Sequence, residues 1–244
     1  MARARTLIAV MLAAPAAHAA PATGAVGGVV RFDGPAPERA PLARDRDPVC
    51  AREPMLAEEI VVTAGKLRDV HVRIRSGTAG VHRAPEAPVV IDQTACMYRP
   101  RVVGIMAGQK LVVRNSDPTF HNVHGSQAGS DLFNDAQPAR QPAIERPVTV
   151  PAGEVLALRC DVHPWMRAFV AVTDHPFFAV TGADGAFTIA GLPPGRYTLE
   201  AWHPVLGLRT AAIRVRAGKT AHADFAFQAS NSSSSAGTAP PGAR

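Results

Sequence analysis

The sequence lacks the features on which several large classes of protein depend. No stretch approaches the roughly 20 uninterrupted apolar residues of a membrane-spanning helix, so we expect a soluble mature protein with no membrane span. No segment keeps the apolar period of a helix for about a dozen residues, and there is no internal repeat. Short apolar runs broken by frequent turns predict an all-β chain that folds as a sandwich or barrel.

Catalytic and nucleic-acid-binding patterns are missing as well. The chain has no G-x-S-x-G turn, no H-E-x-x-H pair and no glycine-rich phosphate loop, which are the patterns of common hydrolases and nucleotide-binding enzymes. The net charge is +6, but the basic residues are scattered and form no stripe interleaved with aromatic residues. Nucleic-acid binding is therefore unsupported, and we predict a protein that is not an enzyme.

The N-terminus carries the pattern of a cleaved signal peptide. Arg3 and Arg5 precede an apolar run at residues 7–14, and an A-x-A site follows at residues 17–19. The apolar run is too short to span a bilayer. These features predict a signal peptide over residues 1–19 and export, so that the mature protein is periplasmic or secreted. Removing the two arginines leaves a mature net charge of +4.

One short segment holds three soft metal-ligating side chains. Cys160, His163 and Met166 form a C-x2-H-x2-M pattern between apolar runs at 155–158 and 168–172. Both runs favour strands, so the three side chains lie on a connecting loop. A loop can point all of them at one ion, whereas a strand would alternate them between its faces. Zinc competes for such donors but rarely uses a thioether, so the set favours copper.

A further histidine is available upstream, where His121 and His124 lie in the segment F-H-N-V-H. Residues three apart on an extended chain point to opposite faces, so only one of them readily faces Cys160. His121, at the turn after N-S-D-P, is the favoured ligand, and His124 is a weaker alternative. A thiolate and two imidazoles with a weak axial Met form the blue-copper arrangement, which predicts one type 1 copper ion.

Two of the three cysteines, Cys50 and Cys96, remain once Cys160 is assigned to a metal. Export permits a disulfide between them, and two leftover cysteines in an oxidising compartment pair more often than they stay free. Two separate buried thiols are the alternative interpretation.

The segments N-S-D-P-T-F-H-N-V-H and C-D-V-H-P-W-M-R together resemble those of the cupredoxins, closest to the amicyanin and plastocyanin group. The resemblance covers roughly residues 89–173 and implies a Greek-key β-sandwich. It implies that His121, Cys160 and His163 are equatorial copper ligands. It further implies that Met166 is the axial ligand, and that the backbone amide of Asn122 donates to the Cys160 sulfur, a contact of the kind that tunes a metal's potential.

The C-terminal unit, with T-G-A-D-G-A-F-T-I-A-G-L-P-P-G-R-Y-T-L-E-A-W-H, looks like a carboxypeptidase-regulatory-like, transthyretin-type β-sandwich. That resemblance implies no catalytic residues. The unit has only about 55 residues, which is small for an independent core. We expect it to lean on the copper domain or to recruit an N-terminal strand. His175, Trp202 and His203 are predicted to pack at the junction of the modules rather than to hold a second metal.

These patterns divide the chain into five parts. They are a signal peptide (1–19), an N-terminal β extension (20–88), a cupredoxin copper domain (89–173), a small carboxypeptidase-regulatory-like β-sandwich (174–228) and a disordered tail (229–244).

The predicted function is that of an exported electron carrier. Copper would pass single electrons between redox partners, with His163 as the ligand nearest the surface. Pro118, Phe120, Pro164 and Trp165 flank the histidines and would dock a redox protein weakly and transiently. The alternative is an extracytoplasmic binding or structural protein, whose C-terminal module contacts a protein or glycan. Copper delivery is a third hypothesis. Delivery requires an open site that exchanges its ion, whereas four ligands including a buried thiolate indicate a closed one.

Overall fold

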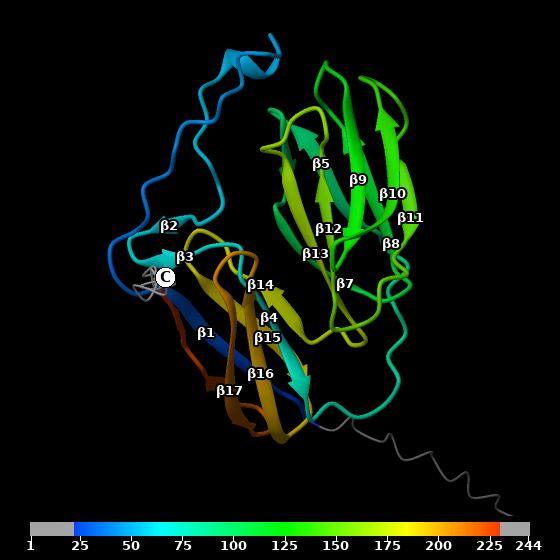
Figure 1. Ribbon diagram of the computed structural model, residues 1–244. Coiled ribbons are helices and arrows are strands. Elements are labelled where there is room, and N and C mark those ends of the chain that lie inside the picture. The colour runs from blue at the N-terminus through cyan, green and yellow to red at the C-terminus, as the bar shows by residue number, and fades with distance from the viewer. Residues whose placement is uncertain (1–21, 230–244) are drawn as a thin grey trace, which may run out of the picture.

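The computed structural model describes residues 22–229, and within this range the chain forms 19 strands and one short 3-10 turn (Figure 1). The all-β prediction is confirmed, and the strands pack as two sandwiches. The predicted signal peptide lies outside the described residues, as does the predicted disordered tail apart from its first residue. Between residues 22 and 229 there is no helix of the length and apolarity that crossing a membrane requires.

The central sandwich is formed by residues 89–173 and packs a five-stranded sheet against a four-stranded one. The strand orders are β10-β9-β12-β13-β7 and β11-β8-β5-β6. Alternation along the strands builds the core. In β12, Leu156 and Leu158 are buried in the shared core while their neighbours are partly exposed. The strands are β5 (Val89–Thr94), β6 (Met97–Arg99), β7 (Val102–Met106), β8 (Lys110–Asn115), β9 (His121–Gln127), β10 (Ser130–Gln137), β11 (Ile144–Pro147), β12 (Val155–Arg159) and β13 (Arg167–Thr173).

The composite sandwich combines the beginning and the end of the described chain, residues 24–76 and 178–227. One sheet has the order β15-β1-β3-β2, with β18 and β19 also paired to β1, and the other has the order β14-β4-β16-β17. The N-terminal strands thus supply part of a core that the short C-terminal unit is too small to build alone. The strands are β1 (Gly24–Phe32), β2 (Val62–Thr63), β3 (Lys66–Leu67), β4 (His71–Ser76), β14 (Phe178–Val180), β15 (Ala186–Leu192), β16 (Gly195–His203), β17 (Gly207–Val215), β18 (Thr220–His222) and β19 (Phe225–Phe227).

Strand β1 has neighbours on both edges, and a glycine makes this possible. A Cβ at Gly28 would overlap the carbonyl oxygen of Ala223, in the link between β18 and β19. Only glycine allows the backbones to approach so closely. Val26 and Val30 on the same strand are fully buried in the core of the composite sandwich. The glycine-rich start of the described chain is therefore an interior strand.

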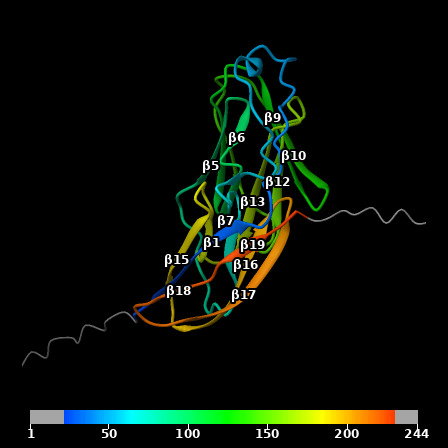
Figure 2. The same ribbon diagram turned by 90° about the vertical axis from the view of Figure 1, so that its left-hand side faces the viewer.

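The chain between β1 and β2, residues 33–61, leaves the composite sandwich, and we name it the arm. Figures 1 and 2 show the arm rising in blue and cyan to the upper end of the central sandwich. Its tip carries the 3-10 turn η1 (Cys50–Arg52). A disulfide joins Cys50 to Cys96, in the turn between β5 and β6. The arm is therefore covalently attached to the domain that it covers.

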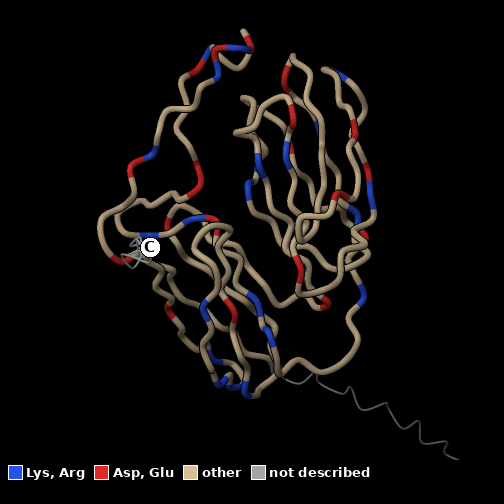
Figure 3. The backbone as a smooth tube through the Cα atoms, in the orientation of Figure 1, with Lys and Arg blue, Asp and Glu red and all other residues tan. Residues whose placement is uncertain are grey.

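Charged residues of both signs lie on the two sandwiches and on the arm (Figure 3). One largely buried carboxylate, that of Glu58 in the arm, accepts hydrogen bonds from Arg99 Nη1 and Nη2 at 2.6 and 3.1 Å. Arg39 and Arg68 lie within ion-pair distance of the same carboxylate. This network attaches the base of the arm to β6 by electrostatic contacts, while the disulfide attaches its tip.

Candidate metal centre

The loop between β12 and β13 carries the three soft side chains, and it is closed by its own backbone. The N–H of Met166 donates to the carbonyl of His163 at 2.8 Å, and the N–H of Cys160 donates to the carbonyl of Met166 at 3.2 Å. Cys160, His163 and Met166 are only 1, 2 and 0% exposed. Cys160 and Met166 belong to the core cluster of the central sandwich. The role of Met166 as an axial ligand remains a prediction.

His121, the first residue of β9, meets this loop. Its Nδ1 lies 2.9 Å from Nδ1 of His163, and the Cys160 sulfur lies 3.7 Å from the same nitrogen of His163. One donor atom from each of the three residues falls within 4.8 Å of the others. His121 is fully buried. A thiol and two imidazoles from segments about 40 residues apart therefore converge at one buried place.

The Cys160 thiol is prepared to ionise. Burial alone would raise its pKa, but hydrogen bonds with His121 and His163 outweigh that effect and lower the pKa to about 6. Burial would also lower the pKa of His121, whereas its hydrogen bonds with Asp117 and Cys160 raise it. Since the thiolate is the form that binds metal, the site favours the metal-binding state of its cysteine near neutral pH.

Asn122 contacts the Cys160 sulfur with both its backbone and its side chain. Its backbone N–H hydrogen-bonds to the Cys160 sulfur. Its side-chain oxygen Oδ1 lies 3.2 Å from that sulfur and accepts from the N–H of Asp161 at 2.7 Å. Donors that face a thiolate stabilise its charge. Asn122 is therefore well placed to fix the start of the loop and to modulate the sulfur.

His124 lies in a separate polar cluster at the surface. Its Nδ1 lies 2.9 Å from Asp161 and its Nε2 lies 2.9 Å from Asp131, while Arg159 Nη2 approaches Nε2 at 3.0 Å. Burial would raise the pKa of Asp161, but its hydrogen bonds, of which that with His124 is the strongest, lower it to about 2. His124 is thus engaged by carboxylates, whereas His121 faces Cys160.

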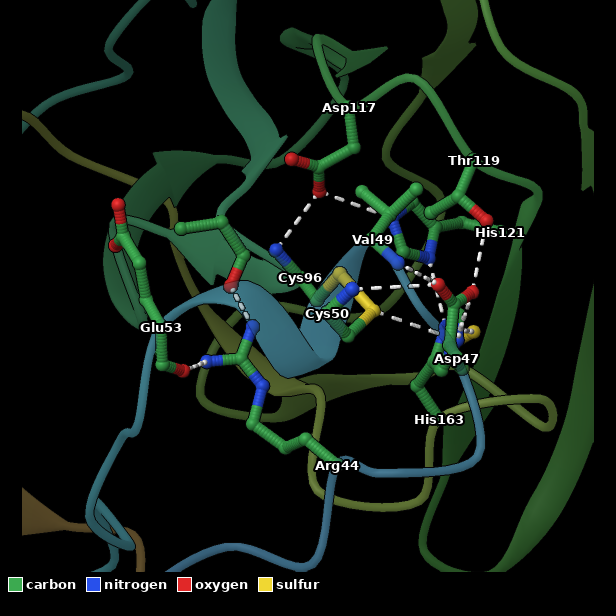
Figure 4. The surroundings of a disulfide bond; sticks show 12 residues. Arg44, Asp47, Val49, Cys50, Glu53, Cys96, Asp117, Thr119, His121 and His163 are labelled. Atoms are coloured by element: carbon green, nitrogen blue, oxygen red, sulfur yellow. Dashed lines mark hydrogen bonds and ion pairs between the residues drawn. A yellow bond between two sulfur atoms is a disulfide. The ribbon is translucent and has the colours of Figure 1, made fainter.

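Two carboxylates that the sequence did not indicate contact the outer nitrogens of the two buried histidines (Figure 4). His121 Nε2–H donates to Asp117 Oδ2 at 3.0 Å, and His163 Nε2–H donates to Asp47 Oδ2 at 3.1 Å. Asp117 lies four residues before His121, so the quoted motif already contained it. Asp47 lies in the arm, 116 residues from His163. The one sequence signal that could have pointed to it is its position three residues before Cys50, which is bonded to Cys96.

The arm covers His163, so this histidine is buried, although it is the one candidate ligand among the four that borders a groove. His163 is only 2% exposed. The Cys50 sulfur lies 3.6 Å from its Nε2, and the Asp47 carboxylate binds that nitrogen. The disulfide joins Cys50 to Cys96, which are 46 residues apart in the sequence, and so holds the arm against His163. The local sequence around His163 gives no sign of this contact.

The four predicted docking residues lie next to the two buried histidines along the chain. Pro118, Phe120 and Pro164 are exposed, and Trp165 is half-buried. Trp165 Nε1–H donates to the carbonyl of Cys96 at 2.9 Å, so the indole is partly committed to holding the disulfide-bonded turn. Three of the four residues are therefore exposed, whereas the His163 imidazole itself is buried.

We name the loop from Cys160 to Met166, which carries the candidate ligands, the metal loop. A groove of about 590 Å³ lies between the arm and this loop. It is lined on one side by Leu42, Ala43, Asp45, Arg46 and Asp47 and on the other by residues 161–165. His163 contributes to its wall.

The predicted junction residues are engaged in packing and hydrogen bonds. His175 Nε2–H donates to the carbonyl of Ile74 at 2.7 Å, and His203 Nδ1 accepts from the backbone of Val205 and Leu206. Trp202 packs edge-on against Phe169 of the central sandwich, with ring centroids 6.0 Å apart. The Trp202–Phe169 contact joins the two sandwiches, whereas the hydrogen bonds of His203 lie within the composite sandwich.

Comparison with known proteins agrees with both resemblances found in the sequence. A carboxypeptidase regulatory-like domain model matches residues 153–228, which confirms the resemblance of the C-terminal unit. The match begins just before β12, so it includes the metal loop as well as the strands from β13 to β19. A comparison with curated proteins found no match.

Among solved structures, the similar ones are cupredoxins. A purple cupredoxin from Nitrosopumilus maritimus is 26% identical over 34% of this chain and 98% of that chain, with a TM-score of 0.30. A mutant of amicyanin in its Cu(I) form is 24% identical over 41% of this chain and 97% of that chain, with a TM-score of 0.32. Amicyanin from Paracoccus versutus is 22% identical over 41% of this chain and 96% of that chain, with a TM-score of 0.32. At these TM-scores the similarity carries no functional inference, which depends instead on the side chains of the site.

Proposed function

We propose that this protein is a type 1 copper protein that carries single electrons, with His121, Cys160 and His163 as equatorial ligands and Met166 as a weak axial ligand. The observation that supports the proposal is the convergence of one thiol and two imidazoles at a buried place. Cys and two His with a distant Met form the donor set of blue-copper electron-transfer sites.

The donor set fits copper better than zinc. Structural zinc sites complete a tetrahedron with nitrogen and thiolate ligands and rarely use a thioether. Here the loop offers one thiol, and the next soft donor along it is the buried Met166. The lowered pKa of Cys160, about 6, provides the thiolate that a soft metal ion prefers.

When bound, copper supplies a one-electron couple between Cu(I) and Cu(II). The protein would hold the ligands in one arrangement and exclude water. His121 is fixed at the start of β9, and the loop is closed by two backbone hydrogen bonds, between Cys160 and Met166 and between Met166 and His163. Because close-packed side chains move little, a change of charge at this place requires little rearrangement, which favours fast transfer.

The proposed partner is a redox protein that docks transiently on the exposed rim. Pro118, Phe120 and Pro164 form this rim beside the arm, and Trp165 lies at its edge. Weak electron-transfer encounters use small interfaces, which a rim of a few apolar side chains can supply. The predicted signal peptide, residues 1–19, places this activity in the periplasm or outside the cell, and the activity proposed is electron transfer rather than enzymatic turnover.

Loading the mature protein with Cu(II) tests the proposal. We expect a strong thiolate-to-copper absorption band at roughly 600 nm and a reversible midpoint potential. A Cys160→Ser variant should lose the band, because the sulfur is its source, while a Cys50→Ala/Cys96→Ala double variant should keep it. A copper-loaded parent protein without the band would rule out the proposed site.

A second candidate function follows from the match to the carboxypeptidase regulatory-like domain over residues 153–228. In this hypothesis the composite sandwich recognises a protein or glycan, and the metal only fastens the loop. A metal-free protein with full partner binding, together with a copper-loaded protein that shows no reversible potential, would favour this second function.

A further inference from the structure

The outer nitrogen of His163, Nε2, is hydrogen-bonded to a carboxylate. Binding of a metal through Nδ1 does not by itself require this contact. Nδ1 of His163 faces Cys160 and His121, while Nε2–H donates to Asp47 Oδ2 at 3.1 Å. The His163 side chain is only 2% exposed, and a buried N–H without an acceptor is unfavourable. Asp47 therefore determines which nitrogen carries the proton and which one is free to face a metal.

The Asp47 carboxylate is itself held in place. Thr119 Oγ1–H donates to Oδ2 at 2.8 Å, and the backbone N–H groups of Val49 and Cys50 donate to Oδ1 at 2.7 and 3.2 Å. One oxygen thus faces the 3-10 turn and the other faces His163. The carboxylate cannot rotate away from the imidazole without losing several of these bonds.

The arm that carries Asp47 is attached beside the metal loop. The Cys50–Cys96 disulfide holds its tip. Arg44 donates to the carbonyl of Glu53 at 3.1 Å and to that of Ala95 at 2.5 Å. Because Ala95 and Cys96 belong to the turn between β5 and β6, these contacts fix the arm relative to the central sandwich.

The same arrangement occurs around the other histidine. Asp117 Oδ2 accepts from His121 Nε2–H at 3.0 Å and from the backbone N–H of Cys96 at 2.8 Å. Figure 4 shows the disulfide between the two aspartates, with each carboxylate directed at one histidine. Both imidazoles are therefore fixed from outside by a carboxylate that is itself bound next to the disulfide.

We propose that Asp47 is a positioning residue for His163, which keeps Nδ1 directed at the copper site and lowers the reduction potential of that site. This inference rests on the proposed function. A carboxylate on the outer nitrogen of a ligand histidine fixes its orientation and raises its basicity as a ligand. Negative charge at short range also stabilises the higher positive charge of Cu(II) relative to Cu(I). Both effects act in the same direction and disfavour reduction.

The test compares two variants of the full mature chain, Asp47→Asn and Asp45→Asn. Asp45 lies in the same arm and is exposed, so its replacement removes a nearby charge without touching His163. We expect Asp47→Asn to raise the midpoint potential clearly more than Asp45→Asn. We also expect it to weaken copper binding by about 10-fold, measured by competition with a chelator.

A measurement on the metal-free protein separates this inference from the proposed function. Nitrogen-15 NMR should show His163 protonated at Nε2, with an Nε2–H that exchanges slowly with water in the parent and in Asp45→Asn but rapidly in Asp47→Asn. Equal potentials and equal exchange rates in the two variants would overturn the role of Asp47, even if the absorption band of copper is present. If the parent lacks that band, the carrier function fails, and the exchange rates alone decide whether Asp47 positions His163.

Discussion

Each of the two buried histidines donates a hydrogen bond to an aspartate, but the two aspartates come from very different parts of the chain. His121 and its carboxylate partner Asp117 are four residues apart at the start of β9. His163 and Asp47 are separated by 116 residues, and the partner arrives on an arm that leaves the composite sandwich. One half of the site is therefore built locally, whereas the other half depends on the folding of a second domain and on one disulfide.

This difference predicts that the two histidines respond differently when long-range structure is removed. The His121 side should keep its geometry as long as the central sandwich is folded. The His163 side should open when the arm is released, because the arm supplies both its hydrogen-bond acceptor and its cover.

The largest effect is expected for the Cys50→Ala/Cys96→Ala double variant. With a separation of 46 residues, the cross-link should contribute about 4 kcal/mol to the free energy of unfolding, measured by urea denaturation. In the metal-free variant, chemical modification of His163 should become fast while that of His121 stays slow. Equal modification rates of the two histidines would contradict the proposed difference between them.

The next effect is expected for Asp117→Ala, which leaves two buried donors, His121 Nε2–H and the N–H of Cys96, without their acceptor. At about 1–3 kcal/mol for each unsatisfied group, the loss should be about 3 kcal/mol in urea denaturation. Asp47→Ala also frees Thr119 and the N–H groups of Val49 and Cys50, but it should cost less, because Asp47 lines the groove and water there can replace its carboxylate. A larger loss for Asp47→Ala would reverse the comparison.

A smaller effect is expected from pH in the metal-free protein. The pKa of Cys160 is about 6 in the folded chain and 9.0 for an unperturbed thiol, so the unfolded state binds more protons between these values. The thiol's contribution to stability should therefore rise as the pH increases from 6 to 8 and should be lost as the pH falls through about 6, whereas the raised pKa of His121 contributes in the opposite direction. Urea midpoints at the two pH values check this, and Cys160→Ala should remove the thiol's share of the slope.

The smallest effect on stability is expected for Phe120→Ala at the rim. Phe120 is 42% exposed, so the change should cost about 0.5 kcal/mol or less. If the rim is the docking surface, electron exchange between copper-loaded molecules should slow severalfold, because the apolar contact is lost. Leu132→Ala is the matched control, since Leu132 is 48% exposed. It lies near the start of β10, whereas the last residue of β10, Gln137, is the one that pairs with His121. Equal rates in both variants would place docking elsewhere.

Much of the site follows from sequence because its signals are local. The C-x2-H-x2-M spacing lies between two short strands, and the backbone closes that loop so that Cys160 and Met166 come together. The preference for His121 over His124 follows from the alternation of side chains on an extended segment. In the structure His121 faces the thiol, while His124 is bound by Asp131 and Asp161.

The cover over His163 could not be predicted, because nothing near His163 in the sequence describes the arm. The segment around Asp47 is rich in Pro, Arg and Asp, a composition that is typical of loops and specifies no position in the fold. Its position depends on Cys50 reaching Cys96 and on the salt bridge between Glu58 and Arg99. Such contacts depend on the relative positions of two sandwiches, which no local pattern specifies.

The sequence by itself determined the all-β class, the loop between two strands and the soft side chains that this loop carries, because each depends on spacing and side-chain chemistry within a few residues. Only the tertiary structure decided that β1 and β4 complete the C-terminal sandwich, and that the arm buries His163 against Asp47. The physical reason is that these features arise from packing between segments far apart in the chain, and burial is a property of the folded whole.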